Sequence, residues 1–288
     1  MLVSLISRNN KVFLRNKMLV FFSLLSVLIS VGVYVVFLQK LQTDAISQVV
    51  PVTKAIEILV SEWMVAGILT TIAMTSTLSV FAIYIQDLET KRTADFLVTS
   101  ASRFNIQLSY VFSSLMIGFM MTFVAFICCE VFIVVIGGSL LSFSAFVKVL
   151  ALILVGVLLS STINLFIVLF INSETAFSTV NTVIGTMIGF LCGIYVPIGV
   201  LPSTVQSVIH FFPVSHIAVL LRQVLMEHSL ASVFEGATAF EESYKLNYGV
   251  VYKIGDSIIS PATSVLFIVG TIVVVLGLSA IAYKRKYK

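Results

Sequence analysis

Charged side chains are scarce in this sequence, since Asp, Glu, Lys and Arg together make up only 10% of its 288 residues. Soluble domains carry about 25% charged residues, so this composition excludes an ordinary soluble protein. The 59% of hydrophobic residues also excludes a disordered chain, because such chains lack apolar surface to bury. The composition therefore indicates a polytopic membrane protein.

Residues for catalysis or metal binding are also sparse. The three cysteines, Cys128, Cys129 and Cys192, lie within apolar runs and show neither a disulfide framework nor a metal-ligand spacing. No GxxxxGKS or GxxxxGKT phosphate loop, HExxH zinc motif or GxSxG nucleophile motif occurs. We therefore predict no catalytic residue, no metal site and no nucleotide site in this chain.

Six apolar runs are long enough to cross a bilayer, whose core of about 30 Å takes roughly 20 helical residues. The runs are continuously apolar rather than alternating, which argues against transmembrane strands. The predicted fold class is therefore an all-α polytopic membrane protein with six transmembrane helices. The predicted spans cover residues 18–38, 64–86, 106–136, 146–171, 177–196 and 261–283.

The basic residues are distributed unevenly between these runs. Four Lys or Arg precede the first run, three lie in 87–105 and four follow the last run, whereas the segments on the other side carry five. Because positive residues concentrate on the cytoplasmic side, we expect both termini to be cytoplasmic. The first run is too long for a signal-peptide core, and no small-residue cleavage site follows it, so we expect it to be an uncleaved first span.

Two cytoplasmic segments have amphipathic patterns. Residues 1–17 separate apolar from basic side chains, as is typical of a helix at the inner membrane interface, although a plain basic flank of the first span is an equal alternative. Segment 87–105 is dense in both charge signs but contains Leu88, Phe96 and Leu97, which suit an apolar knob that docks into a partner. The alternative is that these residues fold back onto the membrane interface.

Residues 197–227 are too apolar for a solvated loop and too rich in proline for a span. Irregular backbone at membrane depth is tolerated only when it is buried in protein or lines a cavity, so we predict re-entrant outer-leaflet helices between spans five and six. Pro202 should lie near the start of one, capped by Ser203 or a neighbour, and another should begin near Ser215. Residues 228–260 are polar enough for a small extracellular subdomain.

Glu130 is the only acidic residue deep within a predicted span, and such groups are costly unless they are paired. Lys148, at the outer edge of the next span, is a plausible partner. Glu130 either contacts a cationic substrate or belongs to a structural ion pair. The hydroxyl-rich stripes at 70–79 and 160–164 favour helix packing, with the lining of a pathway as the other interpretation.

Together these features resemble the permease subunit of ABC-2 type transporters over essentially the whole chain. The interface helix, the segment 87–105 and the re-entrant region occur in the family's order. The most specific part is Gly193-Ile194-Tyr195-Val196-Pro197-Ile198-Gly199-Val200-Leu201-Pro202, followed by Phe212-Pro213-Val214-Ser215-His216 and Leu221-Arg222-Gln223. It is similar to the family's signature after the fifth span, while 87–105 resembles the family's coupling helix.

The resemblance implies roles for two sets of residues within a single ABC-2 transmembrane domain, residues 1–288. The ATPase-coupling set is Asp87, Glu89, Arg92, Phe96 and Leu97, and the outer-gate set is Pro197, Leu201, Pro202, Phe212 and Pro213. Two copies of a cytoplasmic ABC ATPase would bind ATP and Mg²⁺, so this chain would need no cofactor of its own. A second permease copy or a homologous permease would complete the pathway in the bacterial plasma membrane. Membrane lipids are further expected partners, and no nucleic acid is expected.

Within the family, the chain is most similar to Gram-positive permeases that export peptides or drugs, with phenol-soluble-modulin exporters as a possible match. The expected function is ATP-powered export of amphipathic or hydrophobic substrates such as cytolytic peptides, drugs or lipids, with Glu130 on the substrate pathway. One alternative is a non-pumping immunity or sensor protein for a toxic peptide. The other is a secondary carrier, for which one intramembrane carboxylate is a poor basis.

Overall fold

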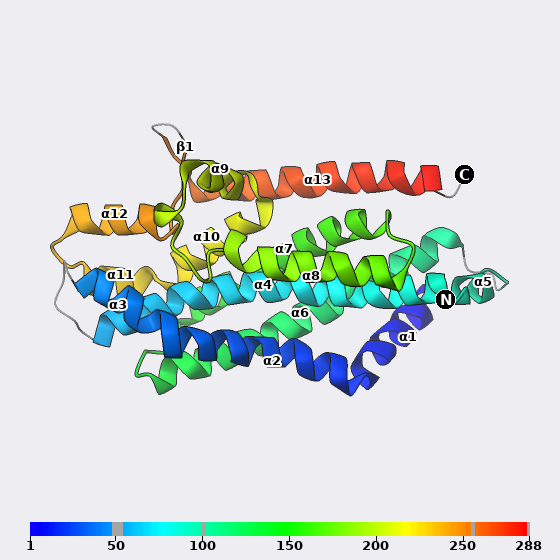
Figure 1. Cartoon of the computed structure of the whole chain (residues 1–288), viewed down its shortest axis with the longest axis horizontal. Helices are drawn as coiled ribbons and strands as arrows, with labels where there is room; N and C mark the ends of the chain where they lie inside the picture. The colour runs from blue at the N-terminus through cyan, green and yellow to red at the C-terminus, as the bar shows by residue number, and fades with distance from the viewer. Residues whose placement is uncertain (48–53, 99–101, 255–256, 287–288) are drawn as a thin grey trace.

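The computed structural model describes residues 1–47, 54–98, 102–254 and 257–286, and in these ranges the chain is almost entirely helical (Figure 1). The helices are α1 (Leu2–Arg15), α2 (Lys17–Val33), the π-helical turn η1 (Tyr34–Leu38), α3 (Gln39–Ser47), α4 (Lys54–Glu89), α5 (Arg92–Leu97), α6 (Arg103–Val135), α7 (Phe143–Val168), α8 (Glu174–Leu191), the 3₁₀ turn η2 (Ile198–Val200), α9 (Ser203–Phe211), α10 (Pro213–Leu225), α11 (Glu227–Val233), α12 (Thr238–Asn247) and α13 (Pro261–Lys286). In the described ranges, β1 (Lys253–Ile254) and β2 (Ser257–Ile258) pair as one antiparallel hairpin. The predicted all-α polytopic class is confirmed, with this hairpin as a small addition.

In the part of the chain that the structure describes, four helices are long and apolar enough to cross a membrane, namely α4, α6, α7 and α13. The helices α9 and α10 qualify as a pair but bend by 88° where they meet, as a broken span or a re-entrant loop does. The predicted first span corresponds to α2, which continues through η1 into α3, and the predicted fifth span corresponds to α8. These two helices are shorter or more polar than the other four, so the count of six spans stays a prediction.

Several boundaries differ from the sequence-based prediction, among them both ends of α4 and the end of α8. The helix α4 begins at Lys54, ten residues before the predicted start of 64, because glutamates that end the apolar run are still good helix formers. It also continues to Glu89, so Asp87 and Glu89 belong to α4 rather than to the coupling segment. The helix α8 ends at Leu191, before the predicted 196, because Gly193 adopts a φ of +66° that turns the chain.

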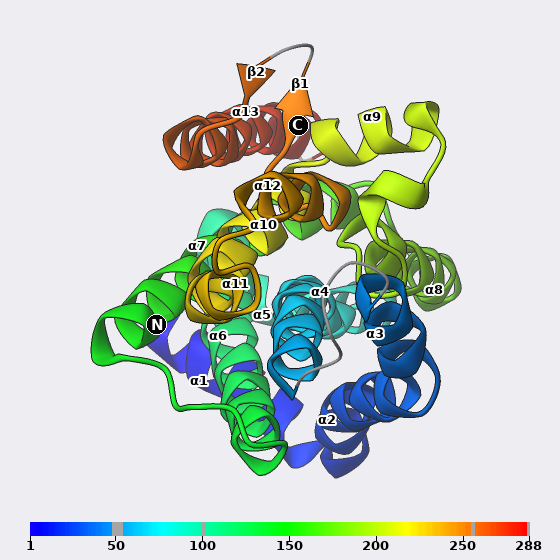
Figure 2. The same ribbon diagram turned by 90° about the vertical axis from the view of Figure 1, so that its left-hand side faces the viewer.

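The helix α4 forms the axis of the bundle, with α2, α6, α8 and α10 around it in the end-on view of Figure 2. Its buried residues extend from Ile56 to Asp87. It packs tightly on α6, where a Cβ atom added to Gly118 would lie 2.5 Å from Thr77 Cγ2. Small residues at such crossings let membrane helices approach closely. The helix α13 lies outside this core, against α7 and α10.

Serine caps define where three of the long helices begin. Each serine hydroxyl accepts a hydrogen bond from the backbone N–H three residues later, which satisfies a donor that has no partner within the helix. The pairs are Ser102–Asn105 (3.2 Å), Ser142–Ala145 (3.2 Å) and Ser173–Ala176 (3.3 Å).

The predicted cap of the re-entrant helix at Ser203 is wrong. Pro202 occupies the N-cap position of α9, and no side chain caps that helix end. The next helix, α10, begins at Pro213, two residues before the predicted Ser215, because proline is well suited to the first helical position.

The amphipathic N-terminal segment is helical, and its buried face packs on protein. Leu5, Asn9 and Phe13 recur every four residues on one side of α1, which packs against α6 and α4. Lys11 and Arg15 are exposed on the other side. The helix therefore combines a bundle-facing side with a basic side that suits an anionic membrane surface.

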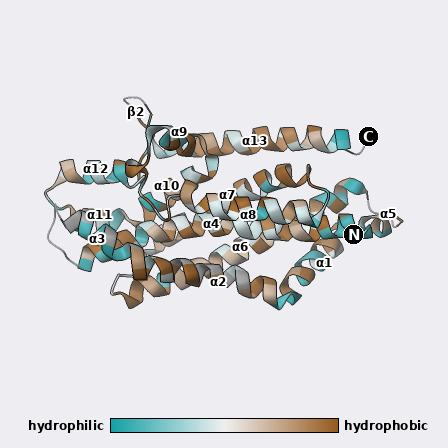
Figure 3. Cartoon of the chain, viewed as in Figure 1, coloured by the Kyte–Doolittle hydropathy of each residue, from teal (hydrophilic) through white to brown (hydrophobic). Residues whose placement is uncertain are grey.

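Polar residues gather toward the two ends of the bundle, and apolar residues predominate between them, as along α13 (Figure 3). The helices α1 and α5 and the C-terminus lie at one end, whereas α11, α12 and the β-hairpin lie at the other (Figure 1). The predicted extracellular subdomain of residues 228–260 corresponds to this second group. Both termini therefore lie at one end of the bundle.

We predict that this end is cytoplasmic, because it carries most of the basic flanking residues. In a variant whose three native cysteines are replaced by alanine, Glu242→Cys on α12 should react with a membrane-impermeant maleimide on intact cells. Lys284→Cys at the end of α13 should react only after permeabilisation. Labelling of Lys284→Cys on intact cells would contradict the predicted orientation.

Candidate functional site

Following the predicted orientation, we call the end of the bundle that holds both termini the inner end and the opposite end the outer end. The inner end of α4 carries a buried carboxylate. Asp87 has no exposed surface and accepts two hydrogen bonds from the Arg8 guanidinium, of which the one from Nη2 to Oδ1 is 2.8 Å long. Tyr110 of α6 donates its hydroxyl proton to Asp87 Oδ2 at 2.7 Å, and Arg92 Nη1 lies 3.7 Å from Oδ1. Asp87 therefore joins α1, α4, α6 and the start of α5.

The electrostatics of this anchor fix α1 to the bundle. The hydrogen bond with Asp87 raises the pKa of Arg8 above its ordinary value, so the guanidinium stays protonated at every physiological pH. Beside it, Asn9 Nδ2 donates to Ser109 Oγ at 3.1 Å in a buried contact. Removing one partner of a buried ion pair costs about 3–5 kcal/mol, so α1 and α4 are expected to move as one unit.

Four of the five predicted coupling residues, Asp87, Glu89, Arg92 and Phe96, make specific contacts inside this chain. Asp87 is internal, as described above. Glu89 Oε2 accepts a hydrogen bond from the backbone N–H of Glu174 at 2.6 Å, and it therefore connects the end of α4 to the start of α8. The helix α5 contains the other three predicted residues.

The helix α5 projects beyond the end of α4 (Figure 1). Phe96, which the sequence suggested as part of an exposed knob, is half-buried, and the Arg8 Cζ atom lies 5.4 Å from the centre of its ring. The exposed apolar residues are Leu97, at 40%, and Val98, at 89%. The exposed surface of this segment therefore includes Leu97, Val98 and the side chain of Arg92, together with Lys91, Ala94 and Asp95.

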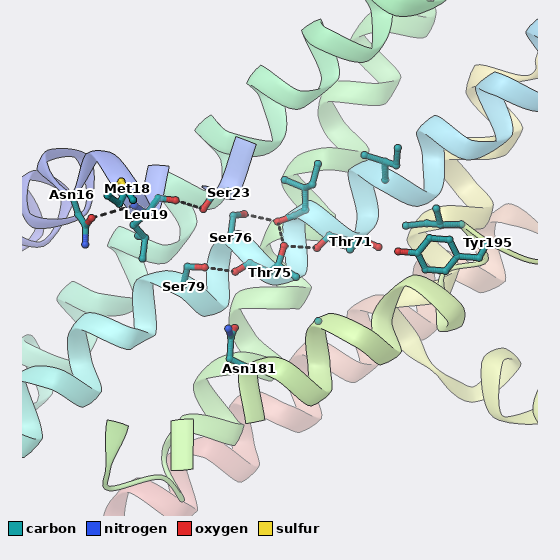
Figure 4. Close-up of a pocket in the computed structure, with 14 residues that line it drawn as sticks. Asn16, Met18, Leu19, Ser23, Thr71, Thr75, Ser76, Ser79, Asn181 and Tyr195 are labelled. Carbon is teal, nitrogen blue, oxygen red and sulfur yellow. Dashed lines mark hydrogen bonds between the residues drawn. The ribbon is translucent and has the colours of Figure 1, made fainter. Parts of the chain in front are cut away.

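A groove of about 600 Å³ runs between α2, α4 and α8 (Figure 4). One face of α4 lines it with four hydroxyl groups, and α8 contributes Asn181. The polar lining residues are Asn16, Ser23, Thr71, Thr75, Ser76, Ser79, Asn181 and Tyr195, and the apolar ones include Met18, Leu19, Ile68, Ile72 and Ile194. The groove therefore offers both polar and apolar surface to a ligand.

Three of the four groove hydroxyl groups on α4, those of Thr75, Ser76 and Ser79, donate their protons within the helix. Thr75 Oγ1 donates to the Thr71 carbonyl at 3.0 Å, and Ser79 Oγ donates to the Thr75 carbonyl at 2.8 Å (Figure 4). A hydroxyl oxygen that donates one bond can still accept others. The groove wall can therefore accept hydrogen bonds from a ligand or from water without breaking the helix.

A second cavity, of about 360 Å³, continues the groove toward the end of the bundle that holds α5. The two cavities share Asn16, Leu19, Ser79 and Asn181, and the second extends to Gln86 and Glu174. Together they form a path beside α4 from Tyr195 to the start of α8.

The helix α8 carries an exposed row of small polar side chains. Its members donate hydroxyl protons to backbone carbonyls four residues earlier, as Thr179, Thr182 and Thr186 do. The exposed polar residues are Thr175, Ser178, Thr179, Asn181, Thr182 and Thr186. Polar residues at membrane depth usually face a water-filled cavity or another helix rather than lipid.

The outer end of the groove is bounded by Ile194 and Tyr195, which follow α8. A buried arginine holds the turn that leads to them. Arg222 Nη2 donates to the carbonyl oxygens of Cys192, at 2.7 Å, and Gly193, at 2.9 Å. The groove therefore ends at a segment that is fixed to α10.

Arg222 also connects this segment to the rest of the outer end. Its Nη1 donates to the Gly249 carbonyl at 3.2 Å, and its Cζ lies 4.9 Å from the ring centre of Trp63 on α4. Trp63 Nε1 in turn donates to the Tyr248 carbonyl at 2.6 Å. Sequence reasoning gave Arg222 no role of its own, although a lone arginine in an apolar helix was an available signal.

The five predicted outer-gate residues lie between α8 and α10, as expected. Pro197 precedes η2, Leu201 follows it, and Pro202, Phe212 and Pro213 mark the ends of α9 and the start of α10. The groove is lined by their neighbours Ile194 and Tyr195, whereas none of the five belongs to its lining.

The predicted pairing of Glu130 with Lys148 is wrong. Glu130 is buried, at 8% exposure, Lys148 is exposed, and no ion pair joins these two described residues. The acidic residue Glu62 of α4 lies near Glu130 and near Ser229 of α11. Sequence reasoning missed Glu62, because the predicted span began at 64 and placed it outside the membrane.

Comparison with known proteins gives one match. The family model described as ABC-2 type transporter matches residues 2–226, which are 225 of the 288 residues. No curated protein sequence matches the chain. The matched range includes the Asp87 anchor, α5, the groove and Arg222.

Arg8→Ala should destabilise the protein, because the buried Asp87 carboxylate loses its bidentate hydrogen bonds from the Arg8 guanidinium. We expect the free energy of unfolding to fall by about 3 kcal/mol, near the lower end for a buried pair, since Arg92 remains nearby. Titration of the detergent-solubilised protein with a denaturing detergent measures the change. Arg15→Ala, on the exposed side of the same helix, should leave stability unchanged, and equal effects of the two variants would refute the anchor.

Proposed function

Because the chain belongs to the ABC-2 type transporter family, we propose that it forms the membrane pathway of an exporter powered by a separate ATPase subunit. As a member of this family, the chain is a multi-pass transport permease without a nucleotide-binding site of its own. The substrate, the route and the ATPase contacts described below are proposals.

The observation that carries the proposed route is the continuous path along α4. The groove of about 600 Å³ and the cavity of about 360 Å³ share four residues, and together they follow α4 from Ile68 to Gln86. Binding sites between helices are typically concave and combine apolar walls with a few placed polar groups. We assign this path to the substrate.

The lining of the path supports an amphipathic substrate. Hydroxyl and amide groups from α4 and α8 suit the polar face of such a molecule, while Met18, Leu19 and Ile72 suit its apolar face. Within the described part of the chain, no Asp, Glu, Lys or Arg lines the larger groove, so strong selection for one charge sign is not expected there. Cytolytic peptides, hydrophobic drugs and lipids all have this character.

A second permease subunit would explain the exposed polar face of α8. In lipid, that row of threonines and Asn181 would lose its hydration, which is costly for unpaired polar groups. Packed against a second copy or a homologous permease, the row would instead face a shared, hydrated path. Two subunits joined along α8 would place two such grooves side by side.

The ATPase subunit would dock on the exposed residues of α5. Leu97 and Val98 supply exposed apolar surface, and Arg92 adds a positive charge at their side. A push on α5 would reach Phe96 and the Arg8 side chain above it, and from there the Asp87 anchor. Because Asp87 belongs to α4, the motion would arrive at the helix that forms one wall of the groove.

The outer gate would comprise Ile194, Tyr195 and the bent pair α9–α10. These residues follow the end of α8 and bound the groove, and Arg222 holds their turn in place. Release of substrate would require this segment to move relative to α4. The five outer-gate residues predicted from the sequence would then hold the turns of this segment, because they lie at the ends of η2, α9 and α10.

Gly185→Trp should block transport while leaving the fold intact. Gly185 lines the groove, and nothing lies within 4 Å of a Cβ atom added there, so a large side chain fills the groove without clashing with the core. We expect efflux of an amphipathic substrate from cells to fall by roughly tenfold or more, as the site is filled. Gly277→Trp on α13, where the added Cβ also meets open space, is the matched control, and equal losses from both would contradict the proposed route.

Val98→Asp should weaken ATPase binding. The substitution replaces an apolar contact side chain by a carboxylate, which loses its hydration when the interface forms. We therefore expect the affinity of the permease for the ATPase to fall roughly tenfold or more. Binding of the purified ATPase to the solubilised permease measures this. The same substitution on α9, Val208→Asp, should have no effect, and unchanged binding by Val98→Asp would place the ATPase elsewhere.

A further inference from the structure

A small cavity lies at the inner end of the bundle, between the coupling helix α5 and the C-terminal helix α13. Its volume is about 200 Å³, several times the roughly 30 Å³ that one water occupies in the liquid. Its polar lining residues come from four helices: Tyr84 of α4, Thr93 of α5, Arg103 and Gln107 of α6, and Tyr283 of α13. The cavity is separate from the groove along α2, α4 and α8, with which it shares no residue.

One donor in this cavity has no partner among the residues that the structure describes. Gln107 is only 9% exposed, and its Nε2 makes no hydrogen bond. A buried amide that has lost its water and found no partner is unfavourable. Elsewhere in the bundle the Nδ2 atoms of Asn9 and Asn164 are hydrogen-bonded to Ser109, Met74 and Thr77. The Gln107 amide is therefore suited to donate to a ligand in the cavity.

The charge around the cavity favours an anion. Among the described residues, no Asp or Glu belongs to its lining, whereas Arg103 does. Asp87 is bonded to Arg8 and Tyr110. On α5, the lining residues Thr93, Ala94 and Leu97 share one face, so Asp95 lies on the opposite side by helical geometry.

The position and the remaining lining point to a lipid. The cavity lies at the same end of the bundle as both termini, where α13 finishes with Lys284 and Arg285, both exposed. Basic residues at the cytoplasmic ends of spans attract anionic lipid headgroups. Leu88, Leu97 and Ile106 add apolar surface, which suits the glycerol and first carbons of a lipid better than a free ion.

We propose that this cavity binds the phosphate group of an anionic phospholipid from the cytoplasmic leaflet. Gln107 Nε2 and the Arg103 guanidinium donate to the phosphate oxygens, since guanidinium geometry matches a phosphate well. The bound lipid connects α5 to α13 and so steadies the coupling helix. That consequence rests on the proposed role of α5, whereas the binding itself does not.

The test measures binding directly on the purified full-length chain. The protein in a neutral detergent is supplemented with phosphatidylglycerol, phosphatidylcholine or inorganic phosphate, and the thermal shift and the lipid retained in native mass spectrometry are recorded. We expect phosphatidylglycerol to raise the melting temperature and to be retained roughly tenfold more than phosphatidylcholine, while inorganic phosphate does neither. A response to inorganic phosphate would identify a free-phosphate site, and absence of any preference would overturn the proposal.

Variants separate the site from general surface charge. Gln107→Met and Arg103→Gln should each abolish the shift caused by phosphatidylglycerol, whereas Lys91→Gln, an exposed cytoplasmic charge outside the cavity, should retain it. Without lipid, Gln107→Met should melt at or above the wild-type temperature, because it removes the unpaired amide. That result excludes misfolding as the cause of lost binding. Equal loss in Lys91→Gln, or an undiminished shift in Gln107→Met, would overturn the proposal.

Discussion

The burial of one long helix at the centre of the bundle is the constraint on which the rest of the structure depends. With 36 residues, α4 is roughly 54 Å long, well beyond the roughly 30 Å of the hydrocarbon core. It therefore reaches out of the membrane at both ends while it packs against most other elements. Its outer part carries Trp63 under Arg222, its middle forms the wall of the groove, and its inner end carries Asp87. Whatever displaces α4 acts on all three places at once.

The polar residues of this helix divide into two groups by their surroundings. Thr77 is fully buried and accepts a hydrogen bond from Asn164 Nδ2 at 2.9 Å, so it cements the packing of α4 on α7. Thr75 and Ser79 lie on another face and line the groove. The packing interpretation of the hydroxyl-rich stripe therefore applies to one side of the helix, while the groove-lining side agrees with the proposed pathway. At one end of this helix, Asp87 is held by charged hydrogen bonds from Arg8, which are stronger than neutral ones. At the other end, the Arg222 guanidinium lies over the ring of Trp63.

The sequence predicted the fold class, the long apolar helices and the break at the re-entrant region, because these depend on local composition and on proline. It also placed both termini on one side, and both lie at one end of the bundle. It failed where a residue's role depends on a distant partner. From the sequence, Asp87 is expected to be a surface charge, but in the structure it is hydrogen-bonded to Arg8 and Tyr110. Glu62 is expected to lie outside the membrane, but it belongs to α4, which begins at Lys54. The groove was beyond prediction because it is formed by α2, α4 and α8, which are distant in sequence.

We propose that the chain is the permease subunit of an exporter that is powered by ATP hydrolysis on a separate subunit. Affinity purification of the tagged chain from its native membrane, followed by an assay of ATP hydrolysis with and without an amphipathic peptide, tests it most directly. The account predicts that an ABC ATPase co-purifies in a fixed ratio and that the peptide stimulates its hydrolysis. An intact, folded chain that purifies without any ATPase and without hydrolysis would contradict it.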